Sequence, residues 1–306
     1  MQCFRVGPVF GMAIIVAAIL TGSGTVCRAQ APAARLATVN GHPVFQREVD
    51  LELLLSRSRQ PTPADQIAAL ERVIDRTLVA KFVATKGADP LAEDVENLLQ
   101  ILRHGIESGG DTFEAVLGRL KLTEADVRLV AQLSVSWQAY VSRTLTETEI
   151  RDYFETHREQ FDGTKVRVSQ IVRTVPITGT PAEWEAAEKL LTDLYQQIQA
   201  GKIEFAAAAA AHSMSPSGKN GGDVGIIGFD GGVLRPVAAA AFSQKVGEVS
   251  RPVRSSVGVH LVKTTERIPG ELSLEDARPA VLSALGEELW VKTVKTLRAK
   301  AKITRE

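Results

Sequence analysis

Apolar residues in the first half of the chain recur three and four positions apart, which is the spacing of one face of a helix. The clearest example covers residues 62–86, with apolar positions at Ile67, Leu70, Val73, Ile74, Leu78 and Val79. Thr62-Pro63-Ala64-Asp65 opens this stretch with a capping residue and a proline in the first turn, and Gly87 ends it. Similar patterns predict further helices over residues 91–106, 112–120, 123–145 and 146–161.

The pattern changes after Asp162-Gly163. Residues 165–175 alternate between apolar and polar and are rich in valine, which predicts a strand. Residues 37–44 alternate around Asn40-Gly41 and predict a hairpin near the start of the chain. Further elements are expected as helices over 181–200, 205–211, 236–242 and 272–301, and as strands over 249–253 and 257–264. The fold class is therefore α+β, with a small sheet surrounded by helices.

The 306-residue chain is long enough for two modest domains. A hydrophobic content of 44% with 24% charged residues is typical of a folded globular protein. The 36 basic residues equal the 36 acidic residues in number. Nucleic-acid binding would favour a basic excess, so we expect no nucleic-acid partner.

The first 29 residues have the features of a signal peptide. Arg5 precedes an apolar run from Val9 to Leu20, and Cys27-Arg28-Ala29 offers a cleavage site before Gln30. We therefore expect residues 1–29 to be removed and the protein to be exported to the periplasm or cell envelope. One alternative is a lipoprotein attached through Cys27. The other is a leader that stays uncleaved as an anchor, and for a chain without lipid we expect membrane contact only in that case. The run is shorter than the roughly 20 residues of a membrane span, which favours cleavage.

Both cysteines, Cys3 and Cys27, lie in this leader, so the mature chain would have no thiol. Such a chain has no disulfide, cysteine nucleophile or thiolate metal ligand. The histidines outside the strand at 257–263 show no metal-ligand spacing, and we expect no metal; they are His42, His104, His157 and His212.

Two segments carry the most specific signal. Residues 212–225 form a glycine-rich turn, His-Ser-Met-Ser-Pro-Ser-Gly-Lys-Asn-Gly-Gly-Asp-Val-Gly, and residues 257–263 form an apolar strand around His260. These segments resemble the parvulin family of peptidyl-prolyl cis–trans isomerases. Further matches follow the family's order at Ser169-Gln170-Ile171-Val172, residues 233–242 and Val246-Gly247-Glu248-Val249. The resemblance covers about residues 166–264 and implies a parvulin domain over 164–267.

The flanks resemble exported chaperone-isomerases of the SurA and PrsA type. The matching phrases are Thr38-Val39-Asn40-Gly41, the helix over 70–79, Leu122-Thr123-Glu124 and the closing helix. This resemblance implies that residues 30–161 form a helical chaperone module. It also implies that the C-terminal helix, in residues 270–306, packs on that module.

The resemblance to parvulins also assigns site residues. The family's polar cluster is two histidines with a cysteine or an aspartate. Here His260 matches the second histidine, Gln170 replaces the first, and Ser215 stands in the place of the acid or thiol. These three are the candidate catalytic residues, and the alternative for His260 is a core histidine with satisfied hydrogen bonds. The substrate-binding positions match Val224, Val233, Val237, Phe242 and Ser255. Among these, Val233 and Val237 stand where the family has Met and Phe.

Isomerisation of an Xaa-Pro bond requires rotation against an amide-resonance barrier of about 18–20 kcal/mol. A catalyst need only bind the twisted amide more tightly than the planar forms, so we expect no cofactor. The expected partners are unfolded or proline-containing polypeptides, and the expected function is that of an exported folding factor that isomerises Xaa-Pro bonds. Two alternatives stay open: a binding-only chaperone with an inactive parvulin domain, and a purely structural envelope protein.

Overall fold

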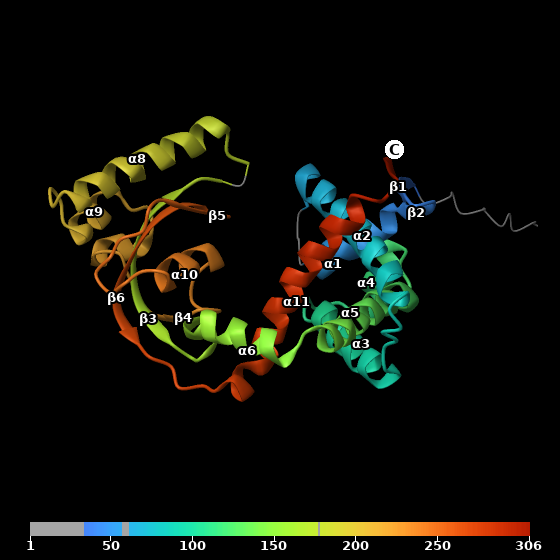
Figure 1. The fold of residues 1–306 in the computed structure, drawn as a ribbon. Helices are drawn as coiled ribbons and strands as arrows, with labels where there is room; N and C mark the ends of the chain where they lie inside the picture. The colour runs from blue at the N-terminus through green and yellow to red at the C-terminus, as the bar shows by residue number, and fades with distance from the viewer. Residues whose placement is uncertain (1–33, 57–60, 177) are drawn as a thin grey trace, which may run out of the picture.

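The computed structural model describes residues 34–56, 61–176 and 178–306, which form two lobes (Figure 1). The predicted leader over residues 1–29 lies outside these ranges. One lobe is helical and contains both ends of the described chain, and the other is built on a small sheet (Figure 1). Across the described ranges, none of the helices combines the length and apolar character that crossing a bilayer requires.

The helical lobe contains α1 to α6, α11 and a three-stranded sheet. Its N-terminal elements are β1 Arg35–Val39, β2 His42–Phe45, α1 Gln46–Leu55, α2 Pro63–Ala84, α3 Ala92–Glu107, α4 Phe113–Leu120, α5 Glu124–Thr144 and α6 Glu147–Thr156. The central strand β1 pairs antiparallel with β2 on one side and with β7, Ile303–Arg305, on the other. The last residues of the chain therefore lie beside the first described ones.

Reciprocal side-chain caps begin the helices where the sequence predicted them. At the start of α2, the Thr62 hydroxyl accepts the Asp65 backbone N–H, and the Asp65 carboxylate accepts the Thr62 backbone N–H at 2.8 Å. Each cap satisfies donors that the first turn of a helix leaves free. The same arrangement starts α5 at Thr123 and α6 at Thr146, which confirms the predicted starts.

Helix α11, Leu274–Arg298, connects the parts of the helical lobe. Its C-terminal half packs Val294 in one apolar cluster with Val79 of α2. Its N-terminal half packs Val281 in another cluster with Phe154 of α6. These contacts make the end of the chain part of the same folded body as its beginning.

The second lobe is a four-stranded antiparallel sheet in the order β4-β3-β6-β5. Its elements are β3 Lys165–Thr174, α8 Pro181–Gln199, α9 Phe205–His212, the 3-10 helix η1 Pro216–Asn220, β4 Asp223–Gly228, α10 Arg235–Phe242, β5 Val253–Ser255 and β6 Gly258–Ile268. The short helix α7, Arg158–Phe161, precedes this lobe and packs with α6 and α11 of the helical lobe. Helices α8 and α9 pack on one face around Ile171 and Leu261. Helix α10 packs on the other face around Val168 and Val262. The observed fold is thus α+β, as predicted.

Some elements differ from the prediction for local reasons. Helix α1 was not predicted, because its buried residues Val49, Leu51 and Leu53 alternate as in a strand. The strand expected over 249–253 begins only at Val253, after Pro252, which has no N–H for the ladder. The helix expected over 146–161 breaks at His157 into α6 and α7.

Candidate active site

The candidate site lies on the face of the sheet that α10 covers in part. Gln170 on β3 pairs with Val262 on β6, and Val172 pairs with His260. Alternate residues of a strand point to the same face, so Gln170 and His260 are diagonal neighbours. The Gln170 side-chain oxygen lies 3.2 Å from His260 Nδ1. Sheet register therefore brings these two predicted residues together across 90 positions of sequence.

Ser255 completes a line of three polar side chains. Its hydroxyl oxygen lies 2.6 Å from His260 Nε2. A side-chain amide oxygen only accepts hydrogen bonds, so His260 Nδ1–H donates to Gln170. In the neutral ring Nε2 is then an acceptor, and it takes the Ser255 hydroxyl proton at 2.6 Å in preference to the Gly258 carbonyl oxygen at 3.3 Å. The imidazole is thus held as one neutral tautomer between an amide and a hydroxyl.

Burial supports the same protonation state. The side chain of His260 is 3% exposed, and burial lowers its pKa below the ordinary value. Gln170 and Ser255 are only partly buried. Any ligand on this face would therefore meet Gln170 and Ser255 first, with His260 behind them.

An apolar cluster adjoins the polar line through Val262, the strand partner of Gln170. Phe242 belongs to this cluster, and the rings of Phe242 and Phe229 meet edge to face with centroids 5.3 Å apart. Val233 and Phe229 are half-buried at its edge. Val237 is 1% exposed and lies inside the cluster.

Ser215 and Val224 lie on the glycine-rich turn and on β4. The Ser215 hydroxyl forms a hydrogen bond with the Ser217 hydroxyl at 3.0 Å, and its backbone N–H donates to Ser213 Oγ. Its polar contacts are thus within its own turn, whereas Gln170 and Ser255 contact His260. Val224 is half-buried on β4, next to β3.

The glycine-rich turn packs against the backbone of Gln170. The Gln170 backbone N–H donates to the Gly222 carbonyl at 2.9 Å. Gly222 has φ +86°, and a Cβ there would lie 2.5 Å from the Gln170 carbonyl oxygen. Only glycine permits both this conformation and this close approach.

Two features of the site, Phe229 and the contact of Ser255 with His260, were not predicted from the sequence. Phe229 follows β4 directly, and nothing in its local pattern marks it as the partner of Phe242. Ser255 was assigned to substrate binding, but its contact with His260 across the β5–β6 turn also gives it a place in the polar line. In the part of the chain that the structure describes, no cluster of His, Cys, Asp or Glu side chains could hold a metal ion.

Comparison with known proteins identifies the domain. The family model described as a PPIC-type PPIase domain (rotamase) matches residues 171–266. The peptidyl-prolyl cis-trans isomerase pin1 of Rhizopus delemar is 34% identical over 111 residues, which are 33% of this chain and 73% of that protein. This chain belongs to the parvulin-type peptidyl-prolyl isomerase family.

Two further relatives extend beyond the parvulin domain. The foldase protein PrsA of Caldanaerobacter subterraneus is 32% identical over 149 residues, which cover 47% of this chain but only 42% of that protein. A probable parvulin-type peptidyl-prolyl cis-trans isomerase of Bordetella bronchiseptica is 24% identical over 276 residues, covering 89% of this chain and 93% of the relative. The second similarity spans the helical lobe as well as the parvulin domain.

Proposed function

We propose that this protein is an exported folding factor that binds unfolded polypeptide and isomerises Xaa-Pro bonds. The observation that carries the proposal is the line Gln170–His260–Ser255 beside the Phe242 cluster, with Gln170 and Ser255 partly exposed. A fixed set of polar groups next to an apolar surface suits a prolyl ring beside its amide. The names foldase and isomerase among the relatives agree with this proposal.

In this proposal, the polar line binds the twisted amide. Twisting removes amide resonance and leaves the prolyl nitrogen with a lone pair that accepts a hydrogen bond. Gln170 uses its oxygen for His260, so its NH₂ group is free to donate to the substrate. Gln170 and Ser255 act as the catalytic residues, and buried His260 positions both. The half-buried Val224, Val233 and Phe229 contact the prolyl ring in front of Phe242 and Val237.

The helical lobe is proposed to hold the rest of the unfolded chain. We assign residues 30–161 together with 270–306 to this module and residues 164–267 to the parvulin domain. The contacts of α11 with α2 and α6 support grouping the two ends of the chain. Export to the periplasm or envelope is proposed from the leader pattern.

A second candidate function is a chaperone that binds polypeptide without isomerase activity. The observation that favours it is the hydrogen bond of Ser215 to Ser217 rather than to the polar line. Glutamine in place of the family's first histidine points the same way.

Refolding of a protein whose slow phase is limited by one Xaa-Pro bond separates the two candidates. The isomerase proposal expects substoichiometric protein to accelerate the slow phase, with most of the acceleration lost in Gln170→Leu. The binding-only candidate expects no acceleration, while aggregation of an unfolded client is still suppressed. A protein with neither effect would contradict both.

A further inference from the structure

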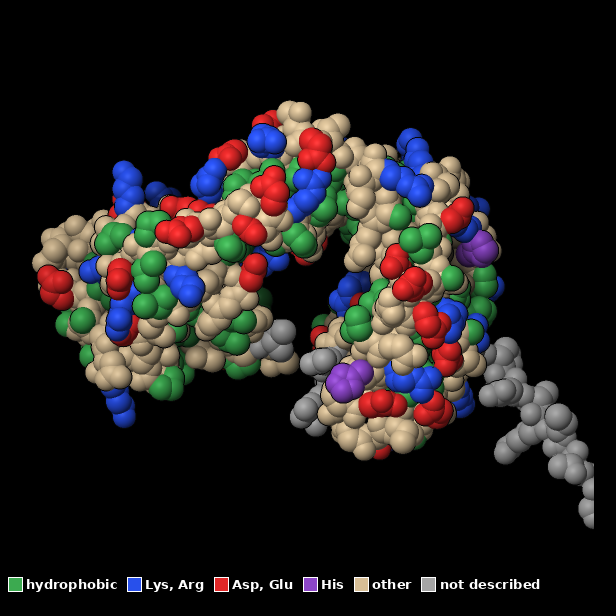
Figure 2. All heavy atoms as spheres, turned by 90° about the horizontal axis from the view of Figure 1, so that it is seen from below, with side chains coloured by type: hydrophobic (Ala, Val, Ile, Leu, Met, Phe, Trp, Pro, Cys, Tyr) green, Lys and Arg blue, Asp and Glu red, His purple; other side chains and the backbone are tan. Residues whose placement is uncertain are grey.

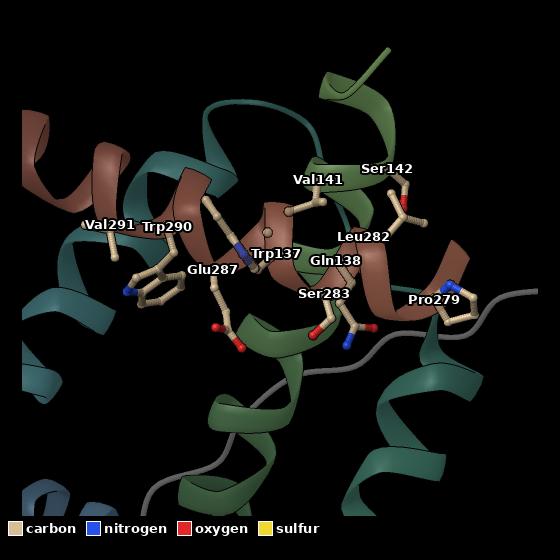
Figure 3. Close-up of a pocket in the computed structure, with 11 residues that line it drawn as sticks. Trp137, Gln138, Val141, Ser142, Pro279, Leu282, Ser283, Glu287, Trp290 and Val291 are labelled. Atoms are coloured by element: carbon tan, nitrogen blue, oxygen red, sulfur yellow. The ribbon is translucent and has the colours of Figure 1, made fainter. Parts of the chain in front are cut away.

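An apolar groove lies in the helical lobe between α5 and α11 (Figure 3). Its volume is about 700 Å³. Its apolar walls are formed by Trp137, Val141, Pro279, Leu282, Trp290 and Val291. The polar side chains that join them at the groove are Gln138, Ser142, Ser283 and Glu287 (Figure 3). This volume is ample for one large side chain with its flanking backbone.

Two tryptophans give the groove an aromatic wall. The rings of Trp137 and Trp290 meet edge to face, with centroids 5.0 Å apart and planes at 85°. Gly286 of α11 also lines the groove, and a Cβ there would lie in ordinary contact with Val141 and Trp137. Glycine inside a helix costs about 1 kcal/mol relative to alanine. Here it lets α11 pack closely against Val141 and Trp137 of α5.

The groove adjoins the parvulin domain. Glu287 at the groove lies 3.7 Å from the guanidinium of Arg235, the first residue of α10. Arg235 is two residues from both Val233 and Val237 of the proposed proline site. The space-filling view shows the lobes joined at one end, with an open gap between them (Figure 2). The Arg235–Glu287 contact therefore places the groove beside the start of α10, close in sequence to Val233 and Val237.

Glu287 is also open to a second cation. Its side chain is 65% exposed, and 3.7 Å from Arg235 is longer than a hydrogen bond. Such a pair contributes little by itself. A Lys or Arg beside an apolar guest could therefore approach Glu287 without breaking a strong contact.

We infer that the α5–α11 groove binds an aromatic side chain, preferably flanked by a basic residue, of the same polypeptide whose proline occupies the parvulin site. This inference rests on the proposed function and names a second segment of the same polypeptide ligand, in addition to its proline. A spacer of about five to ten extended residues, at 3.3–3.6 Å each, spans about 17–36 Å, which suits two sites whose lobes touch through Arg235 and Glu287. Two linked contacts bind more tightly than either alone when the spacer spans both sites.

Fluorescence anisotropy with labelled peptides tests the inference on the full chain. One peptide carries an Ala-Pro pair, and a second adds Lys-Phe seven residues away. A third carries Lys-Phe without proline. We expect the second peptide to bind about tenfold more tightly than either of the others. Ser283→Phe, which fills the groove, should remove this gain. The matched control Thr296→Phe, on an exposed part of α11 away from the groove, should retain it.

The outcomes separate the inference from the proposed function. Equal affinity of the Ala-Pro peptide with and without Lys-Phe overturns the groove, even if the short peptide is isomerised. A gain that persists in Ser283→Phe also overturns it, provided that the variant unfolds with the wild-type transition. Tight binding of the Lys-Phe peptide that proline does not improve overturns the shared ligand. Failure to isomerise the short peptide, with the Ser283-dependent gain intact, contradicts only the isomerase activity.

Discussion

At the scale of single residues, the candidate site depends on which side chains touch His260. Gln170 and Ser255 hold its two ring nitrogens, whereas Ser215 bonds within its own turn. The imidazole is buried and cannot reach a ligand directly. Changes at Gln170 and Ser255 should therefore affect turnover more than changes at Ser215.

The two serines provide a matched pair of substitutions. Ser255→Ala removes the hydroxyl that donates to His260 Nε2, and a hydrogen bond of this kind contributes about 0.5–1.5 kcal/mol. We expect kcat/KM for a short Ala-Pro peptide to fall about tenfold. Ser215→Ala should change it by less than about twofold. A large loss in Ser215→Ala with none in Ser255→Ala would contradict the assigned polar line.

The neutral state of His260 predicts a pH dependence. Burial lowers its folded pKa below the ordinary value of 6.5, so the unfolded chain binds this proton more readily. The contribution of His260 to stability is complete above pH 6.5 and is lost as the pH falls through the folded pKa. Isomerase activity should stay flat at and somewhat below pH 6.5 and decline only as the pH falls through the lowered folded pKa, because a protonated Nε2 cannot accept from Ser255. An imidazole pKa above 6.5, measured by NMR titration, would refute this assignment.

At the scale of elements, the glycine-rich turn and the helix caps fix the local structure. The turn places Gly222 against the backbone of Gln170, so its role is to support the site. The neighbouring Gly225 also has positive φ, but a Cβ there would meet nothing within 4 Å. The two glycines therefore share a positive φ but differ in what a Cβ at each position would contact.

Alanine substitutions should separate strain from contact. Gly225→Ala should cost about 1–3 kcal/mol of unfolding free energy through its positive φ alone. Gly222→Ala should cost more and should also reduce activity, because the new Cβ displaces Gln170. Denaturant unfolding and peptide isomerisation of both variants provide the test. Equal effects on stability and activity would show that Gly222 does not support Gln170.

Local sequence signals predicted the elements that depend on neighbours in sequence. The capping residues Thr62, Thr123 and Thr146 located helix starts, and an apolar run placed His260 in a buried strand. Helix α1 escaped because its buried positions alternate. The rotamer of Ser215 depends on the conformation of its turn, which residue type does not specify.

At the scale of the whole molecule, contacts between residues far apart in sequence determine how the two lobes are arranged. No local sequence pattern predicts these contacts. The pairing of β7 with β1 and the Arg235–Glu287 contact join residues far apart in sequence. The chain passes between the lobes near residues 162–164 and again near residues 270–272, and these two segments are hydrogen-bonded to each other. Leu272 N–H donates to the Asp162 carbonyl at 2.8 Å, and Gly270 N–H donates to Thr164 Oγ1 at 3.0 Å. On the face shown in Figure 2, acidic and basic side chains are interspersed.

Glu71 of α2 binds the C-terminal segment to the start of the chain. Burial alone would raise its pKa, but hydrogen bonds from Arg298 and Arg305 outweigh burial and lower the pKa below the ordinary value. Glu71→Gln should reduce the free energy of unfolding at neutral pH by about 1–2 kcal/mol. The exposed pair of Glu155 with Arg158 is the control, and Glu155→Gln should cost less than about 0.5 kcal/mol.

The effect of Glu71 should depend on pH in a defined direction. Because the folded pKa is lowered, its contribution is complete above the ordinary value and is lost as the pH falls through the folded value. Wild type and Glu71→Gln should therefore converge in strongly acidic solution. A difference that is constant with pH would show that the charge of Glu71 is not responsible.

The central claim is that a prolyl segment binds on the sheet face beside Gln170, His260 and Phe242. NMR titration of the full chain with a short Ala-Pro peptide tests it most directly, with the Ala-Ala peptide as control. We predict saturable shifts of the Gln170 side-chain amide, the His260 imidazole and the Phe229 and Phe242 rings with the proline peptide only. Unchanged resonances at these four residues, or equal shifts with both peptides, would contradict the account.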